Sequence, residues 1–147
     1  ECEPLQITFI VNSLKRKQAK VFTMKVLSMM AHELSQEQMD DFSELNGEIC
    51  QFKQLKDVGP SLYKDLVQCP AELEELEFLV SNTIELASCY DAVILPIGSP
   101  VFMFMLARDI SEVECFFSHS ERVSEEDRET GVKISKFKHI RFILVCT

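Results

Sequence analysis

Short apolar runs alternate with longer amphipathic stretches along most of this chain. The runs rich in Val, Ile, Leu and Phe are bounded by polar or turn-forming residues, which is typical of strands. The stretches between them repeat their apolar residues at helical spacing. The predicted strands are residues 25–30, 48–55, 92–95, 114–118 and 133–144, and the predicted helices are residues 35–45, 61–67, 70–87 and 100–110.

Strands that alternate with helices and then end in a pair of strands indicate an α/β fold. We predict a Rossmann-like sandwich with a mostly parallel sheet and a C-terminal antiparallel hairpin. The wholly apolar run 92–95 is typical of the centre of a parallel sheet. The acidic stretch Glu121–Thr130 is expected to form the loop of the hairpin.

Residues near the element ends support these boundaries. Ser35 begins a capping-box sequence, so a helix should start there, and Gly47 supplies its C-terminal stop. Pro70 suits the first helical position of the long acidic helix. Ser99 followed by Pro100 predicts another helix start. That last helix is apolar nearly all round, so we expect it to be buried.

The first 23 residues differ from the rest of the chain. They contain a predicted strand, Gln6–Val11, and the basic run Lys15–Lys20. We interpret residues 1–23 as an N-terminal extension, either an extra edge strand or a start-site artefact. Residues 24–147 are predicted to form a single domain, because an apolar content of 46% is enough for one compact core.

Composition narrows the partners of this domain. The net charge of −9 argues against long nucleic acid and against an anionic membrane surface, because both need a broad basic face. The six cysteines contain no CxxC pair, and we expect reduced, buried thiols in a cytoplasmic protein. The sequence signatures of dinucleotide-binding enzymes, P-loop NTPases, α/β hydrolases and zincins are absent. We expect no metal ion and no cofactor.

Candidate functional residues gather where the predicted strands end. Ligands of open parallel sheets bind beyond the carboxyl ends of the strands. A helix start adds backbone N–H groups that favour an anion. The candidates are His32 after the first strand, Gly98 and Ser99 after the third, and Ser118, His119, Ser120 and Arg122 after the fourth.

The last strand is basic, unlike the rest of the domain. It carries four Lys or Arg residues, one His and no acid between residues 133 and 142. Period-two alternation places one set of side chains on each face. Phe137, His139 and Arg141 are expected on one face, and Lys136, Lys138 and Ile140 on the other. Together with the hydroxyl groups at the strand ends, this predicts a site for an anionic ligand, most simply a phosphate.

Structural explanations stay open for the same residues. His32 can be an ordinary loop residue, and Ser99 can serve only as a helix cap. The polar residues Ser118–Arg122 can form a simple hairpin entry. The lysines of the last strand can protect an edge strand from pairing with other chains.

Four segments resemble the small CRISPR-associated accessory proteins of the Csx type. They are Val26–Gln38, Asp91–Ser99, Ser118–Arg122 and Ser135–Phe142. The likeness covers roughly residues 24–145, and the Phe-Lys-His-x-x-Phe ending is its most specific part. Members of that group are similar to sensor domains that bind cyclic oligoadenylates, and several are ring nucleases.

The resemblance implies a homodimer that binds cyclic tetra-adenylate on its two-fold axis and cleaves it without a metal ion. The 2′-hydroxyl of the ligand would attack the neighbouring phosphorus while the protein aligns the groups and stabilises charge. It implies His32, His139 and Lys138 as catalytic residues, His32 as a general acid or base. The implied ligand contacts are Gly98, Ser99, Ser118, His119, Ser120, Arg122 and Arg141, with Arg122 as a phosphate-binding fork.

Two other functions stay open. The protein can bind the cyclic nucleotide without cutting it, as a sequestering or sensing module. Alternatively, it is a structural α/β protein in which the apolar helix 100–110 only forms a dimer.

Overall fold

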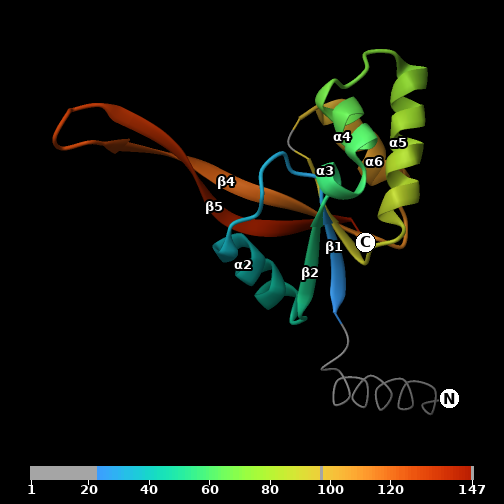
Figure 1. The fold of residues 1–147 in the computed structure, drawn as a ribbon, viewed down its shortest axis with the longest axis horizontal. Coiled ribbons are helices and arrows are strands. Elements are labelled where there is room, and N and C mark those ends of the chain that lie inside the picture. Colours follow the sequence, from blue (N-terminus) through green and yellow to red (C-terminus); the bar gives the residue numbers. More distant parts are fainter. Residues whose placement is uncertain (1–22, 97, 147) are drawn as a thin grey trace, which may run out of the picture.

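The computed structural model describes residues 23–96 and 98–146, and a five-stranded sheet forms its centre. The strands lie in the order β2-β1-β3-β4-β5 (Figure 1). The strands are β1 (Met24–Ser28), β2 (Cys50–Gln54), β3 (Ala92–Ile94), β4 (Glu114–Glu126) and β5 (Lys133–Cys146), and the helices are α2 (Gln36–Asn46), α3 (Leu55–Val58), α4 (Pro60–Val67), α5 (Leu73–Ala87) and α6 (Pro100–Asp109). The predicted strand Gln6–Val11 lies outside the described residues.

Four neighbouring strands pair in parallel, and the fifth strand pairs antiparallel at one edge of the sheet. β1 pairs with β2 and β3, β3 pairs with β4, and β4 pairs with β5 in the opposite direction. The predicted fold class is therefore confirmed. From β1 the chain first forms β2 on one side and then β3, β4 and β5 on the other side. The topological switch point therefore lies between β1 and β3.

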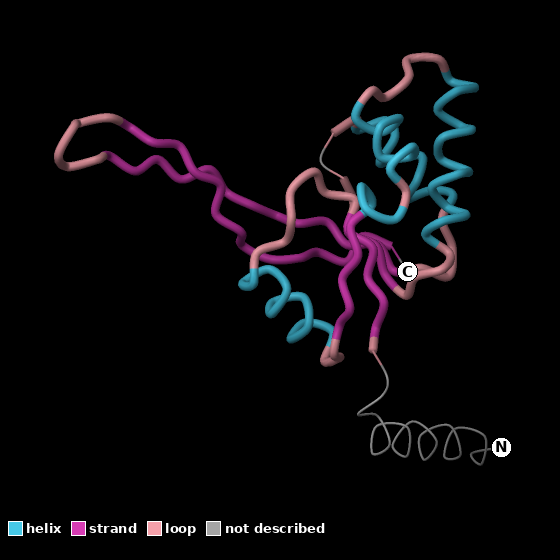
Figure 2. Tube along the Cα trace, in the orientation of Figure 1, coloured by secondary structure: helices cyan, strands magenta, loops and turns pink. Residues whose placement is uncertain are grey.

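Helices cover both faces of the sheet (Figures 1 and 2). α4, α5 and α6 pack on one face, against a core that includes Leu27, Val93 and Cys115. α2 packs on the other face, where Phe42 lies among Val26 and Ile94. Because both faces are covered, β3 is buried along its whole length, which explains its wholly apolar sequence.

Phe42 is the centre of the core under α2. Its ring makes edge contacts with Phe52, Phe116 and Phe142, at centroid distances of 5.7, 4.7 and 5.2 Å. Edge-to-face pairs of this kind add to the stabilisation that burial alone provides. One helical residue therefore joins β2, β4 and β5.

Three predicted helix ends are confirmed. The Ser35 Oγ accepts a hydrogen bond from the Gln38 N–H at 3.2 Å, and the Gln38 side chain accepts one from the Ser35 N–H at 2.9 Å. Gly47 ends α2 at φ 63°, a conformation that glycine adopts without strain. Ser99 caps α6, with Pro100 at its first position.

The predicted start of α5 at Pro70 is wrong. α5 begins at Leu73, after Glu72 in an extended conformation that provides no side-chain cap. A fixed φ and a missing N–H suit a turn as well as a helix start. Pro70 lies in the connection between α4 and α5 instead.

The prediction that α6 is buried on all sides is correct for one side only. Phe102, Met105 and Leu106 are buried, whereas Val101 and Phe104 are exposed. An apolar sequence alone does not show which side of a helix meets the sheet. No helix in the described part of the chain is long and apolar enough to cross a membrane.

The C-terminal hairpin is longer than predicted (Figure 2). The stretch expected to be its loop continues β4 as far as Glu126, and β5 starts opposite it at Lys133. β3 pairs with β4 only as far as Phe116, so the outer part of the hairpin is a two-stranded ribbon. We call residues 120–139 the arm. Opposite charges across the ribbon, such as the 3.5 Å ion pair of Lys136 and Glu125, favour strands over a loop.

A β-bulge decides which side chains share a face of the arm. Neighbouring residues of β4 pair with Arg141 and His139, so Ile140 is an extra residue on β5. His139 therefore shares a face with Phe142, and their ring centroids are 4.8 Å apart. The prediction that Arg141 shares the face of His139 is wrong, because simple alternation fails across a bulge.

Candidate functional site

A small cavity lies at the topological switch point, where β1 and β3 end. Its volume is about 60 Å³, and its lining includes Ala31, Tyr63, Cys69, Gly98 and Ser99. Ligands of open α/β sheets bind at this position. Typical small-molecule sites occupy about 300–1,000 Å³, so this cavity has room for only part of a nucleotide.

Ser99 acts as a helix cap beside this cavity. Its Oγ accepts a hydrogen bond from the Phe102 N–H at 3.3 Å, and its carbonyl accepts one from the Met103 N–H at 3.1 Å. Pro100 has no N–H to offer. The start of α6 therefore has few N–H groups left for an anion, which favours the capping role of Ser99.

A buried polar network joins α2 to the C-terminal hairpin. His139 Nε2 lies 2.8 Å from Asp41 Oδ2, and His139 Nδ1 lies 3.4 Å from Ser118 Oγ. The His139 side chain is 7% exposed and Ser118 is 2% exposed. The three residue types match a hydrolase triad, but a nucleophilic serine has to reach its substrate. Because Ser118 is buried, we interpret the network as a structural link between α2 and the hairpin.

Polar side chains continue from this network along one face of the arm. Arg122 Nε donates a hydrogen bond of 2.6 Å to Ser135 Oγ. The guanidinium carbon of Arg122 lies 5.9 Å from the centroid of the Phe137 ring, which is 77% exposed. Alternate residues of a strand point to the same side. The face toward α2, which we call the α2-side face, comprises Ser120, Arg122, Ser124 and Glu126 of β4 and Lys133, Ser135, Phe137 and His139 of β5.

The other predicted site residues lie apart from the α2-side face. His32 is exposed in the loop after β1, where its carbonyl accepts a hydrogen bond of 3.4 Å from Gln54 Nε2. Lys138 is exposed and alternates with His139, so the two side chains do not act from the same side. His119 and Arg141 lie opposite each other in the β4–β5 register, on the face of the hairpin away from His139.

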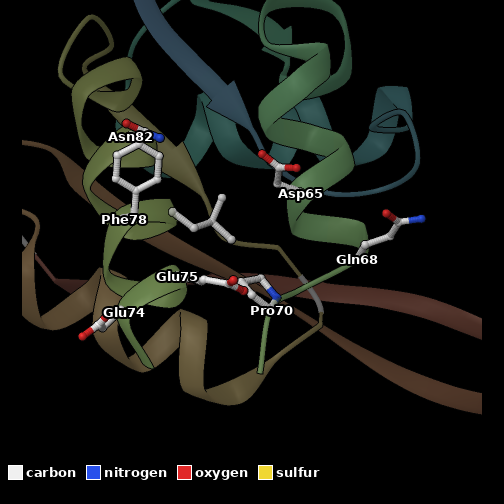
Figure 3. A pocket seen from close by; sticks show the side chains of 8 residues that line it. Asp65, Gln68, Pro70, Glu74, Glu75, Phe78 and Asn82 are labelled. Atoms are coloured by element: carbon white, nitrogen blue, oxygen red, sulfur yellow. The ribbon is translucent and has the colours of Figure 1, made fainter. Parts of the chain in front are cut away.

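A second groove, of about 430 Å³, lies between α4 and α5 (Figure 3). Figure 3 shows the Phe78 ring beside Asn82, with Asp65 across the groove. Its carboxylates repel phosphate groups, so this groove is a poor nucleotide site. The lining residues are Asp65, Gln68, Pro70, Glu74, Glu75, Phe78, Leu79 and Asn82.

Among residues 23–96 and 98–146, no three His, Cys, Asp or Glu side chains lie close enough together to hold a metal ion. Cys50, Cys69 and Cys89 form no disulfide within the same ranges. Burial raises the pKa of the Cys50 thiol, and a hydrogen bond with Ser43 offsets part of this effect. A raised pKa keeps the thiol protonated and unreactive at neutral pH.

Residues 24–143, which contain the network, the arm and all of the sheet except the end of β5, match the model of a protein family described as the Uncharacterized protein MJ1673 family. The chain belongs to this family. No curated protein and no solved structure matches the chain. The family match therefore covers both the buried network and the α2-side face.

Sequence reasoning missed three residues of this region. Asp41 looks like one more acidic residue on the solvated side of α2, and nothing local shows that it meets a histidine 98 positions later. Phe137 was expected on the face of His139 but was not named as a candidate, and the same alternation would have added Ser135. The sequence signal for these residues was the basic strand 133–142, in which the aromatic Phe137 stands between two lysines.

Proposed function

We propose that this protein binds a cyclic oligoadenylate, cyclic tetra-adenylate in particular, and cleaves it as a ring nuclease that ends type III CRISPR antiviral signalling. The resemblance of four sequence segments motivates the choice of ligand. The observation that carries the proposal is the grouping of Ser120 and Arg122 on one face of β4, where the strand leaves the sheet. Hydroxyl groups and guanidinium forks are common partners of phosphodiesters.

Arg122 is well suited to hold a phosphate. A guanidinium group has five N–H donors, and the hydrogen bond to Ser135 uses the one on Nε. That bond also restricts the orientation of the fork, so less conformational freedom is lost when a ligand binds. Ser120, the neighbouring residue on the same face, adds a hydroxyl group.

Cleavage would use the ligand's own 2′-hydroxyl. Its oxygen attacks the adjacent phosphorus, the bond from phosphorus to the 5′-oxygen breaks, and a 2′,3′-cyclic phosphate remains. A base takes the proton of the 2′-hydroxyl, and an acid gives a proton to the departing 5′-oxygen. His32, exposed after β1, is the proposed proton carrier, and Arg122 would stabilise the charge on the phosphoryl oxygens, so the bound ligand would have to reach from the α2-side face to the loop after β1.

Binding without cleavage is the second candidate, and one observation favours it. Both ring nitrogens of His139 are engaged, by Asp41 and Ser118, inside the protein. The His139 side chain is only 7% exposed, so it does not present a nitrogen to a ligand, which leaves His32 as the proton carrier. A purely structural role is the remaining alternative.

Labelled cyclic tetra-adenylate separates these functions. The ligand is incubated with the purified protein, with and without EDTA, and linear products are resolved beside a binding assay. Linear products that form in EDTA support the ring nuclease, and binding without products supports the sequestering module. Neither binding nor products leaves only the structural role.

Substitutions test the individual residues. Arg122→Ala should weaken binding about 10-fold or more, because charge-assisted hydrogen bonds contribute about 1.5–3 kcal/mol. Arg128→Ala removes the same charge from the tip of the hairpin and should leave affinity within about 2-fold. If the two variants bind equally well, Arg122 is not a ligand contact. His32→Ala should abolish cleavage but not binding; cleavage at the wild-type rate removes His32 from the mechanism.

A further inference from the structure

The arm lacks the support that keeps a two-stranded ribbon folded. A lone two-stranded hairpin is at best marginally stable in water, and a third strand or a packed surface is needed. Beyond Phe116, β4 pairs with β5 alone, and the ribbon projects away from the helices (Figures 1 and 2). It nevertheless exposes apolar side chains, most of all Phe137. Exposed apolar groups on an unsupported ribbon indicate a surface that another molecule covers.

The charges on the α2-side face of the arm are complementary to themselves when the face is turned end to end. Ser124 and Ser135 form a pair of small residues at its centre. On β4, Arg122 lies two residues to one side of this centre and Glu126 two residues to the other. On β5, Phe137 and Lys133 are placed in the same way. Turning this face end to end about its centre therefore places the acidic position of β4 over the basic position of β4. It likewise places the basic position of β5 over the aromatic position of β5.

We propose that a second copy of this chain covers the arm, with the two α2-side faces packed against each other and their strands running in opposite directions. The two-fold axis passes between the central serines, whose small side chains let the ribbons approach. Arg122 then meets Glu126 of the partner subunit as an ion pair. Lys133 of the partner subunit meets the Phe137 ring as a cation–π contact, on the ring face that Arg122 of the same copy leaves open.

The other surfaces of the arm do not complement themselves. Both edges of the arm are open, because β4 has no β3 partner beyond Phe116. An edge-to-edge pair of β5 strands would bring lysines together, and at the β4 edge three glutamates outnumber one arginine. On the face away from α2, Lys136 already pairs with Glu125, and Lys138 lies opposite Glu121. Those charges are balanced within one copy. On the α2-side face Lys133 lies opposite Glu126 in the same way, whereas Arg122 lies opposite Phe137, so the charge of Arg122 is the one that a second copy balances.

This inference does not rest on the nucleotide proposal. It names the contact between two copies, and three of its residues, Glu126, Lys133 and Phe137, have no part in the proposed ligand site. Arg122 belongs to both, so a phosphate ligand and the second arm would compete for it. Dimerisation is measured without ligand, so failure of one proposal leaves the other standing. Because only one face of a two-stranded ribbon takes part, we expect a weak dimer with a Kd of about micromolar order.

Sedimentation velocity of the full chain, up to about 100-fold above a micromolar Kd, tests the proposal. Wild type should shift from monomer to dimer, and added salt should weaken the dimer. Glu126→Arg should raise the Kd about 10-fold or more, because it places two arginines together. Glu129→Arg makes the same charge change in the hairpin turn and should leave the Kd within about 2-fold. The double variant Arg122→Glu with Glu126→Arg should restore the dimer, which a misfolded arm would not do.

Phe137→Trp gives a second readout, because the chain contains no tryptophan. Its emission should move to shorter wavelength over the concentration range in which the dimer forms. A protein that stays monomeric at every concentration overturns the proposal. A dimer that forms equally well with Glu126→Arg, or one that leaves the emission of Phe137→Trp unchanged, shows that a different surface is used and overturns it too.

Discussion

Asp41→Ala tests whether the contact between Asp41 and His139 is structural. The substitution removes the partner of His139 Nε2, at 2.8 Å, from a side chain that is 7% exposed. A buried polar group left without a partner costs about 1–3 kcal/mol. The Asp41 side chain is itself 41% exposed, so water reaches the position of the lost carboxylate. We therefore expect a loss near the lower end, about 1–1.5 kcal/mol of unfolding free energy.

Urea unfolding at pH 7, followed by circular dichroism, measures this loss. Asp40→Ala is the matched control, because it removes the same charge from the neighbouring, exposed position of α2 and should change stability by about 0.5 kcal/mol or less. Asp41→Asn keeps an acceptor oxygen and should lie between the two. A double-mutant cycle with His139→Ala should give a coupling energy of about 0.5–1.5 kcal/mol.

The interpretation fails if Asp41→Ala is no more destabilising than Asp40→Ala. It also fails if the coupling energy is zero within error. If His139→Ala instead abolishes cleavage of cyclic tetra-adenylate and leaves stability unchanged, His139 is catalytic. The resemblance to ring nucleases would then describe its role better than the buried network does.

Three further predictions concern the fold. Phe42→Ala should cost about 3–5 kcal/mol in urea unfolding, whereas the exposed Phe104→Ala should cost about 0.5 kcal/mol or less; similar losses would contradict the placement of Phe42. Gly47→Ala should cost about 1 kcal/mol by the same assay, because φ is 63°, and no loss would mean that α2 ends differently. A hydrogen bond from the Glu129 N–H lowers the pKa of Asp127. The stabilisation that this hydrogen bond gives to the ionised Asp127 is complete above the ordinary pKa of about 3.9, and it disappears as the pH falls through the lower pKa of the folded protein. An NMR titration of the Glu129 amide should show this transition, and a transition at the ordinary pKa contradicts the prediction.

The order of elements could be predicted from sequence because each signal is local. The capping box at Ser35 and the stop at Gly47 depend on a few neighbouring residues, and both are present in the structure. The start of α5 was missed because Pro70 suits a turn and a helix start equally. The length of β4 was missed because Glu121–Glu126 looks like a loop, and it becomes a strand only opposite the lysines of β5.

The candidate site was harder to predict because it depends on contacts between distant segments. The bulge at Ile140 moves Arg141 off the face of His139, and no pattern in the strand announces it. Asp41 becomes a partner of His139 only after α2 packs on the hairpin. The grouping of Ser120 with Arg122 was predictable, since alternation within one strand does not require knowledge of the fold.

The bulge marks the position at which β5 can lose a single residue without turning the side chains of the arm over. The part of β5 that packs in the body and the part that forms the arm are out of phase by one residue, with Ile140 between them. Deleting Ile140 would only make the ladder regular, because Arg141 already pairs with His119 and His139 with Ser120. Deleting any other single residue from the β5 part of the arm would turn the side chains beyond it to the opposite face. Removing two residues from each strand would shorten the arm by about 7 Å and keep every side chain on its face. We therefore expect related chains to gain or lose arm residues in pairs.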